Sequence, residues 1–316
     1  MNILLPKVIT PEMFGVGTTI PEVDTVMGEV AWVSGASAVE RDRRVWKGST
    51  YECVQIISGA PANAYEPGTS AAAPYWERDE GAPSNRMAPF DKYLFTKTRR
   101  PGGFTIVLKP GFVNGLAIYG IEADVLDITV KAGGVDLIES VHVELWQQAF
   151  GEWEYLFGDL QRGTYFTLKD LPIHPDPEIS ITVSRNSPDV MAAIGYASVG
   201  NWKRFLFPGQ VEMGAAQFGV EASTRDYSYL EERKDGTYTE VEGRKATNIN
   251  LTCVIDADQA PAAKALFDQI LGKVVAIEVE SLPRYGHLAT VGKVTATVRS
   301  TDWTSAQVDM QIKGNV

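Results

Sequence analysis

The sequence predicts a mainly β, multi-domain protein, and three observations support this prediction. Many short stretches alternate apolar and polar residues between Gly, Pro, Asp and Asn, which is typical of antiparallel sandwiches and barrels. The clearest helix signal spans residues 259–271, where an Asp cap, an early proline and a final glycine bracket apolar residues at helical spacing. The length of 316 residues predicts two or three domains.

Residues 1–30 are expected to form an extended N-terminal arm. Pro6, Pro11 and Pro21 each fix φ and remove a backbone donor, which disfavours a helix. Two arrangements remain open for this segment. It lies across a neighbouring molecule, or it packs on its own domain.

Residues 31–84 are predicted to form a small tryptophan-rich β module. A hairpin is expected in which residues 44–46 and 50–57 flank the turn Trp46-Lys47-Gly48-Ser49. The basic run over 41–47 is either a solvated hairpin face or a contact for an acidic partner. Four aromatic residues either form the core of the module or expose a platform for sugar rings, and these are Trp32, Trp46, Tyr51 and Trp76.

Residues 85–200 are predicted to form an antiparallel β-sandwich of the jelly-roll type. Ile179, Ile181 and Val183 share one strand face, which predicts that this face lies in a core. The expected strands are short and closely spaced, and they cover residues 104–108, 116–121, 127–131, 142–146, 155–157, 165–168 and 178–184.

Residues 201–316 are predicted to form a C-terminal β domain with one helix. Asp235-Gly236 is a strong hairpin signal between residues 226–232 and 237–242, because glycine accepts a positive φ. The remaining elements are expected in the order strand, helix, then three strands, at residues 248–255, 259–271, 274–280, 288–298 and 306–313.

The charge balance excludes several classes of partner. The chain has 29 Lys and Arg and 40 Asp and Glu, which gives a formal net charge of −11. Such a balance argues against general nucleic-acid binding and against adsorption to an anionic membrane surface. There is no apolar stretch long enough to span a membrane, and a signal peptide is not expected at the N-terminus.

The residue types that catalysis and metal binding need are scarce. Cys53 and Cys253 are expected to be buried free thiols. His142 and Glu144 share a strand face but have no further ligands at a metal-site spacing, and His174 has no serine nucleophile elbow near it. No catalytic residue, metal or cofactor is therefore expected. A glycosidase or an esterase is retained as a third alternative.

The module at 31–84 matches a known pattern at Trp32, Asp42, Gly48, Tyr51 and Trp76. On these residues it resembles the small chitin-binding-type modules of carbohydrate-binding families 5 and 12. The tyrosine of that pattern falls near Ala38, and its glycine falls at Arg41. The resemblance implies a carbohydrate site formed by the four aromatic residues named above.

Short motifs spread over most of the chain support a second resemblance, and they are Thr18-Thr-Ile-Pro, Asn85-Arg-Met-Ala-Pro-Phe-Asp, Val199-Gly-Asn-Trp-Lys, Gln217-Phe-Gly, Asp226-Tyr-Ser and Gly243-Arg-Lys-Ala. On these motifs the chain resembles structural proteins from the tail tip and baseplate of tailed bacteriophages. The C-terminal domain is similar to the ring-forming domain of tail-tube and distal-tail proteins. The sandwich is similar to galactose-binding-like jelly rolls.

This resemblance implies a structural protein without catalytic activity. The chain is expected to form a homo-oligomeric ring of six or three around the tail axis and to dock other phage tail proteins. Its expected location is the virion, after assembly in the host cytoplasm. The alternative is a carbohydrate-binding, receptor-recognising tail component that contacts a host-surface glycan.

Overall fold

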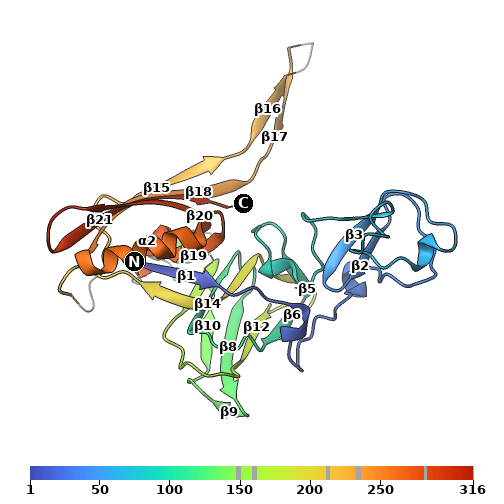
Figure 1. Cartoon of the computed structure of the whole chain (residues 1–316), viewed down its shortest axis with the longest axis horizontal. Helices are drawn as coiled ribbons and strands as arrows, with labels where there is room; N and C mark the ends of the chain where they lie inside the picture. Colours follow the sequence, from blue (N-terminus) through green and yellow to red (C-terminus); the bar gives the residue numbers. More distant parts are fainter. Residues whose placement is uncertain (147–150, 159–161, 211–213, 233–235, 281–282, 316) are drawn as a thin grey trace. The chain divides into compact units, whose positions relative to one another are not determined.

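The computed structural model describes residues 1–146, 151–158, 162–210, 214–232, 236–280 and 283–315. The protein is mainly β, with 45% strand and 12% helix, which confirms the predicted class. The chain divides into two compact units (Figure 1). Unit 1 comprises Met1–Pro6 and Val199–Val316, and unit 2 comprises Lys7–Ser198.

Unit 1 is built on a curled antiparallel sheet with the strand order β14-β1-β19-β20-β21-β18-β15. The strand β14 enters this unit at Val199. The bounds are β1 Asn2–Pro6, β14 Tyr196–Arg204, β15 Glu221–Asp226, β18 Lys245–Asp256, β19 Val274–Glu278, β20 Ala289–Ser300 and β21 Ser305–Gly314.

The helix of unit 1, α2 (Ala260–Ile270), lies against the sheet and confirms the predicted helix to within one residue at each end. Its buried residues Ala263, Phe267 and Ile270 belong to the core of this unit. The rings of Phe205 and Phe267 stack, with centroids 5.7 Å apart. The Asp256 side chain accepts a hydrogen bond from the backbone of Asp258 in η5 (Ala257–Gln259), the turn that leads into α2.

The expected N-terminal arm is divided between the two units. β1 is an interior strand of unit 1, antiparallel to both β14 and β19, and its residues Ile3 and Leu4 are fully buried. The apolar run that precedes Pro6 is long enough for a strand, and burial of this run offsets the loss of one backbone donor at the proline. Residues 7–30 belong to unit 2 and contain the short turns η1 (Pro11–Met13) and η2 (Thr25–Met27).

Unit 2 contains a sheet with the order β10-β8-β12-β6, in which β9 also pairs with β8. On β12, Ile179, Ile181 and Val183 are fully buried, which confirms the predicted core face. The pairs β7–β11 and β5–β13 complete this region. The bounds are β5 Thr98–Pro101, β6 Gly103–Leu108, β7 Gly115–Tyr119, β8 Val125–Ala132, β9 Val135–Asp136, β10 Val141–Glu144, β11 Tyr165–Leu168, β12 Glu178–Ser184 and β13 Met191–Ile194.

The strand predicted at residues 155–157 is wrong, because these residues end a short helix, α1 (Glu152–Phe157). Two acidic residues occupy its first turn, where the helix dipole favours negative charge. Trp153 and Phe157 are four residues apart and their ring centroids lie 4.5 Å from each other, as side chains at this spacing do on one face of a helix.

The tryptophan-rich module lies in unit 2 and contains β2 (Arg43–Trp46), β3 (Ser49–Cys53) and β4 (Trp76–Arg78). The predicted turn between β2 and β3 is confirmed, with Trp46 opposite Ser49. Lys47 and Gly48 both have positive φ, at 48° and 74°, as a tight two-residue hairpin turn requires. The connecting segments include η3 (Ala62–Ala64) and η4 (Ala88–Phe90).

The predicted second hairpin is confirmed as β16 (Tyr229–Glu232) and β17 (Tyr238–Val241). Residue Asp235 of the predicted turn lies outside the described residues, and Gly236 has a φ of 81°. Within unit 1 the hairpin extends beyond the paired strands β15 and β18 (Figure 1). A last turn, η6 (Pro283–Leu288), precedes β20. None of the helices in these described ranges is long and apolar enough to cross a membrane.

Candidate functional site

The four aromatic residues expected to form a sugar site are divided between the core and the surface of the module. Trp76 is only 5% exposed and belongs to a small core with Cys53 and Ile57. Trp32 and Tyr51 are partly buried and pack against this core. The core interpretation therefore applies to Trp76, which is closed to a ligand.

Trp32 and Trp46 form a half-exposed aromatic corner. Their ring centroids lie 4.8 Å apart at an interplanar angle of 66°, so the rings meet edge to face and are not coplanar. Glu66 accepts a hydrogen bond from Trp46 Nε1 at 2.9 Å and from Lys47 Nζ at 2.6 Å. The hydrogen bond from Lys47 lowers the pKa of Glu66, so the corner holds a carboxylate beside two indole rings.

The remaining aromatic residue of the predicted site, Tyr51, is held by a nearby loop. A Cβ built on Gly68 would lie 2.8 Å from Tyr51 Oη, and the φ of Gly68 is +87°. Only glycine therefore lets this loop approach the tyrosine ring so closely. Tyr51 also packs against the module core.

Three of the four basic residues of the run over 41–47 form ion pairs within the module itself. Arg43 forms ion pairs with Glu52 at 3.3 Å and with Asp79 at 3.1 Å. Arg44 pairs with Asp42 at 3.0 Å, and Lys47 pairs with Glu66. These contacts favour the interpretation of the run as a solvated hairpin face.

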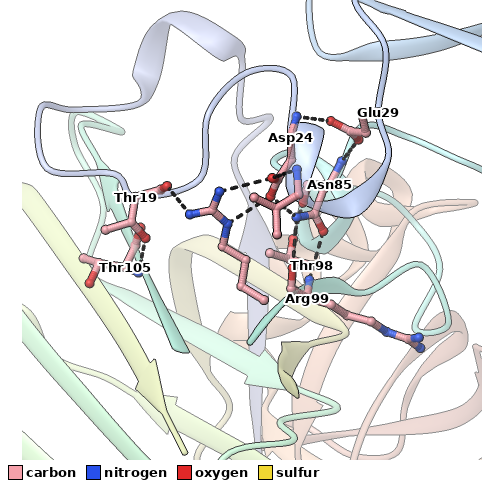
Figure 2. Close-up of polar contacts among 9 residues, drawn as sticks. Thr19, Asp24, Glu29, Asn85, Thr98, Arg99 and Thr105 are labelled. Atoms are coloured by element: carbon pink, nitrogen blue, oxygen red, sulfur yellow. Dashed lines mark hydrogen bonds and ion pairs between the residues drawn. The ribbon is translucent and has the colours of Figure 1, made fainter. Parts of the chain in front are cut away.

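A buried polar network ties together the chain segments that enter and leave the module (Figure 2). Asp24 is fully buried and accepts hydrogen bonds from Arg100 Nε at 3.0 Å and from Asn85 Nδ2 at 2.8 Å. Arg100 also donates to the carbonyl oxygen of Thr19 at 2.9 Å. Burial raises the pKa of Asp24, but the hydrogen bonds from Arg100 and Asn85 outweigh it and hold this pKa below its ordinary value.

Glu29 belongs to the same network and contacts the backbone of two of its members. Its carboxylate accepts hydrogen bonds from the backbone N–H of Asp24 at 2.6 Å and of Asn85 at 2.5 Å. Burial raises the pKa of Glu29. Asn85 also exchanges hydrogen bonds with the backbone of Arg99. The network fixes the base of the module, and the sequence offered no local signal for it because its hydrogen-bonded members lie up to 81 residues apart.

The other candidates from the sequence do not form a reactive centre. His142 Nδ1 lies 2.5 Å from an Asp127 carboxylate oxygen on an exposed strand face. His174 Nδ1 accepts a hydrogen bond from the backbone of Asp176 within a turn. Among the residues that the structure describes, no group of three or more His, Cys, Asp or Glu side chains is arranged to hold a metal ion.

The two cysteines are buried free thiols, as predicted, and each lies in a different unit. Burial raises the pKa of Cys253 to about 12, and it also raises the pKa of Cys53. Neither thiol is therefore a reactive thiolate at neutral pH.

Unit 1 presents the second candidate surface, around the β16–β17 hairpin. Seven of the eight residues in its two strands are exposed, and the eighth, Val241, is half-buried. Tyr229, Leu230 and Tyr238 are 60%, 63% and 68% exposed. These large exposed side chains lie on a two-stranded ribbon apart from the main sheet, which makes the ribbon a candidate interaction surface.

The comparisons with protein families and with curated proteins found no match. The function is therefore argued from the geometry of the two surfaces described above.

Proposed function

We propose that the chain is a structural component of a phage tail tip or baseplate, without catalytic activity, and that it assembles with itself through unit 1. The observation that supports this proposal is the exposed β16–β17 hairpin. An isolated two-stranded hairpin is at best marginally stable in water and needs a further surface to pack against. No neighbouring element among the described residues covers its strands, so a partner molecule is the natural cover.

In this proposal unit 1 is the ring-forming domain. Its curled sheet with one covering helix supports the resemblance to tail-tube and distal-tail domains. Six or three copies surround the tail axis. Unit 2, with its jelly-roll sandwich and its tryptophan-rich module, docks neighbouring tail proteins or contacts the host surface. The location follows from this role and is the virion, after assembly in the host cytoplasm.

The proposal is tested by the mass of the purified full-length chain in solution. Native mass spectrometry and light scattering behind size exclusion are expected to show a defined oligomer of six or three copies. Negative-stain images of the same sample are expected to show rings. A chain that stays strictly monomeric at high concentration, alone and with other tail proteins, contradicts the proposal.

A second candidate function, glycan recognition, is supported by the corner of Trp32, Trp46 and Glu66. Half-exposed aromatic faces beside a carboxylate suit a sugar ring, which offers C–H edges for stacking and hydroxyl donors. Binding to a glycan array that is lost in Trp46→Ala and kept in Trp153→Ala supports this function. Trp153 is a matched control, because it is an exposed tryptophan elsewhere in unit 2. No binding to host polysaccharide at millimolar concentration counts against it.

A further inference from the structure

The outer face of the unit 1 sheet is polar and uncovered over three neighbouring strands, β18, β21 and β20. Alternate residues of β21 (Ala306, Val308, Met310 and Ile312) are buried in the core, so the residues between them point outward. The strand register places outward residues side by side in rows. One row is Asn250, Gln311 and Thr295, and the next is Thr252, Asp309 and Thr297.

Two lysines continue this face and lie directly opposite each other. Lys293 on β20 pairs in register with Lys313 on β21, and both are exposed. Like charges in directly opposite positions destabilise a sheet. Lysine protects the edge strands of many sheets, but β20 and β21 are both interior strands. In the described part of the chain, neither lysine has a carboxylate within ion-pair distance.

The β16–β17 hairpin carries the complementary charge. Its register places Leu230 opposite Glu240 and Glu232 opposite Tyr238, so these four side chains share one face. All four are exposed. The two strands contain no Lys or Arg. This face therefore presents two apolar anchors between two carboxylates.

We propose that this hairpin face docks on the Lys293–Lys313 face of a second copy of the same chain. The inference rests on the proposed self-assembly and names the two surfaces that meet. Glu232 and Glu240 are diagonal neighbours, within reach of a lysine pair on facing strands. The contact pairs two cations and two anions that have no partner in the described part of one chain. It also covers Leu230 and Tyr238.

Simple strand addition is the less favoured route to the same oligomer. The edge strand of unit 1, β15, carries Glu221, Arg225 and Asp226, and all of its residues are exposed. Charged side chains on an edge strand oppose edge-to-edge pairing. The contact is therefore expected between a hairpin face and a sheet face.

Charge exchange in the full-length chain tests the docking. The variant Lys293→Glu/Lys313→Glu has acidic groups on both surfaces, and the variant Glu232→Lys/Glu240→Lys has basic groups on both. Each variant alone is expected to lose assembly, with a dissociation constant raised at least about tenfold. An equal mixture of the two is expected to associate again, since each surface then meets its opposite charge. The two variants must alternate, so the mixture closes a ring of six but not a ring of three.

The control is Lys203→Glu/Lys273→Glu, which makes the same charge change at exposed lysines elsewhere in unit 1. It is expected to assemble like the wild type. Circular dichroism melting is expected to show that all variants remain folded. Variants that assemble alone, or a mixture that stays dissociated, overturn the docking while the wild-type oligomer still supports the proposed function. A wild-type chain that never assembles overturns the proposed function itself.

Discussion

The two hairpins of this protein have similar lengths but opposite surroundings. The β2–β3 hairpin of unit 2 buries Val45 and Cys53, and its basic side chains pair with carboxylates of the same module. The β16–β17 hairpin of unit 1 buries none of its residues, and its carboxylates form no ion pair among the described residues. The first hairpin packs within its own module, whereas the strands of the second are exposed. The proposed self-assembly accounts for this difference by giving the second hairpin a partner surface.

The largest effect is expected where the first hairpin packs on its core. Trp76→Ala removes a nearly fully buried indole and leaves a cavity in the module. The free energy of unfolding of the module is expected to fall by about 3–5 kcal/mol, as for other large-to-small core substitutions. Chemical denaturation followed by fluorescence measures this loss. Trp303→Ala is the control, since Trp303 is 100% exposed and its removal is expected to change stability little.

The buried polar network at the base of the module is expected to contribute almost as much to the free energy of unfolding as the Trp76 side chain. Asp24→Asn keeps the shape of the side chain but removes the charge that Arg100 contacts through Nε and Nη2. The expected loss is about 2–3 kcal/mol, because the hydrogen bonds to Asp24 are charge-assisted and largely screened from water. Thermal or urea unfolding gives the value. If Asp24→Asn lowers the free energy of unfolding by less than Asp268→Asn does at an exposed position, a stabilising role of the Asp24 carboxylate is contradicted.

Substitutions in the β16–β17 hairpin are expected to weaken assembly without changing the stability of the folded chain. Leu230→Ser/Tyr238→Ser removes two exposed apolar anchors, so the melting temperature of the dissociated chain is expected to change little. The dissociation constant of the oligomer is expected to rise by about tenfold or more, as for anchors at an interface. Sedimentation over a dilution series measures it. An unchanged dissociation constant in this variant contradicts a role of the β16–β17 hairpin in assembly.

The pH dependence of the free energy of unfolding tests the effect of burying Glu29. Burial raises the Glu29 pKa above its ordinary value of 4.5, so the folded state favours the protonated carboxyl. This contribution to stability is full below 4.5 and is lost as the pH rises through the raised pKa. Glu29→Gln has no such dependence. Its stability relative to the wild type is therefore expected to improve as the pH rises over this range, in urea titrations at several pH values.

The smallest effect is expected at the surface of the first hairpin. Lys47→Ala removes the ion pair with Glu66, but Lys47 lies in solvent, where such pairs contribute little. The free energy of unfolding is expected to change little, because solvent screens this exposed ion pair. Denaturation in parallel with the wild type checks this. If Lys47→Ala lowers the free energy of unfolding as much as Asp24→Asn does, the corner of Trp32, Trp46 and Glu66 is part of the module core.

Local patterns predicted the elements whose signals lie within a few residues. The turn at Lys47-Gly48, the alternating residues of β12 and the span of helix α2 are confirmed. The Asp cap predicted for α2 is wrong, because Gln259 precedes the helix without a side-chain cap and the Asp256 side chain caps the preceding turn η5. The errors have local causes too. The strand β15 has no alternating signal because its residues are polar on both faces, and residues 155–157 of α1 predict a strand because Tyr and Phe favour strands.

The candidate site was predicted only in part for a similar reason. The aromatic spacing identified the module but could not separate Trp76, which is buried, from Trp46, which is half-exposed. A side chain's exposure depends on what lies across the sheet, and that neighbour is distant in sequence. The lysine pair of unit 1 had no sequence signal, because Lys293 and Lys313 become neighbours only through strand pairing.

The sequence by itself determined the β class, the two hairpins, the long helix and the scarcity of catalytic residue types. These features depend on residues close together in the chain and on composition. Only the tertiary structure decided that β1 joins the C-terminal strands, that Asp24 meets Asn85 and Arg100, and that two lysines face each other on interior strands. Such contacts depend on which distant segments share a sheet or a core, and local propensity does not specify that choice.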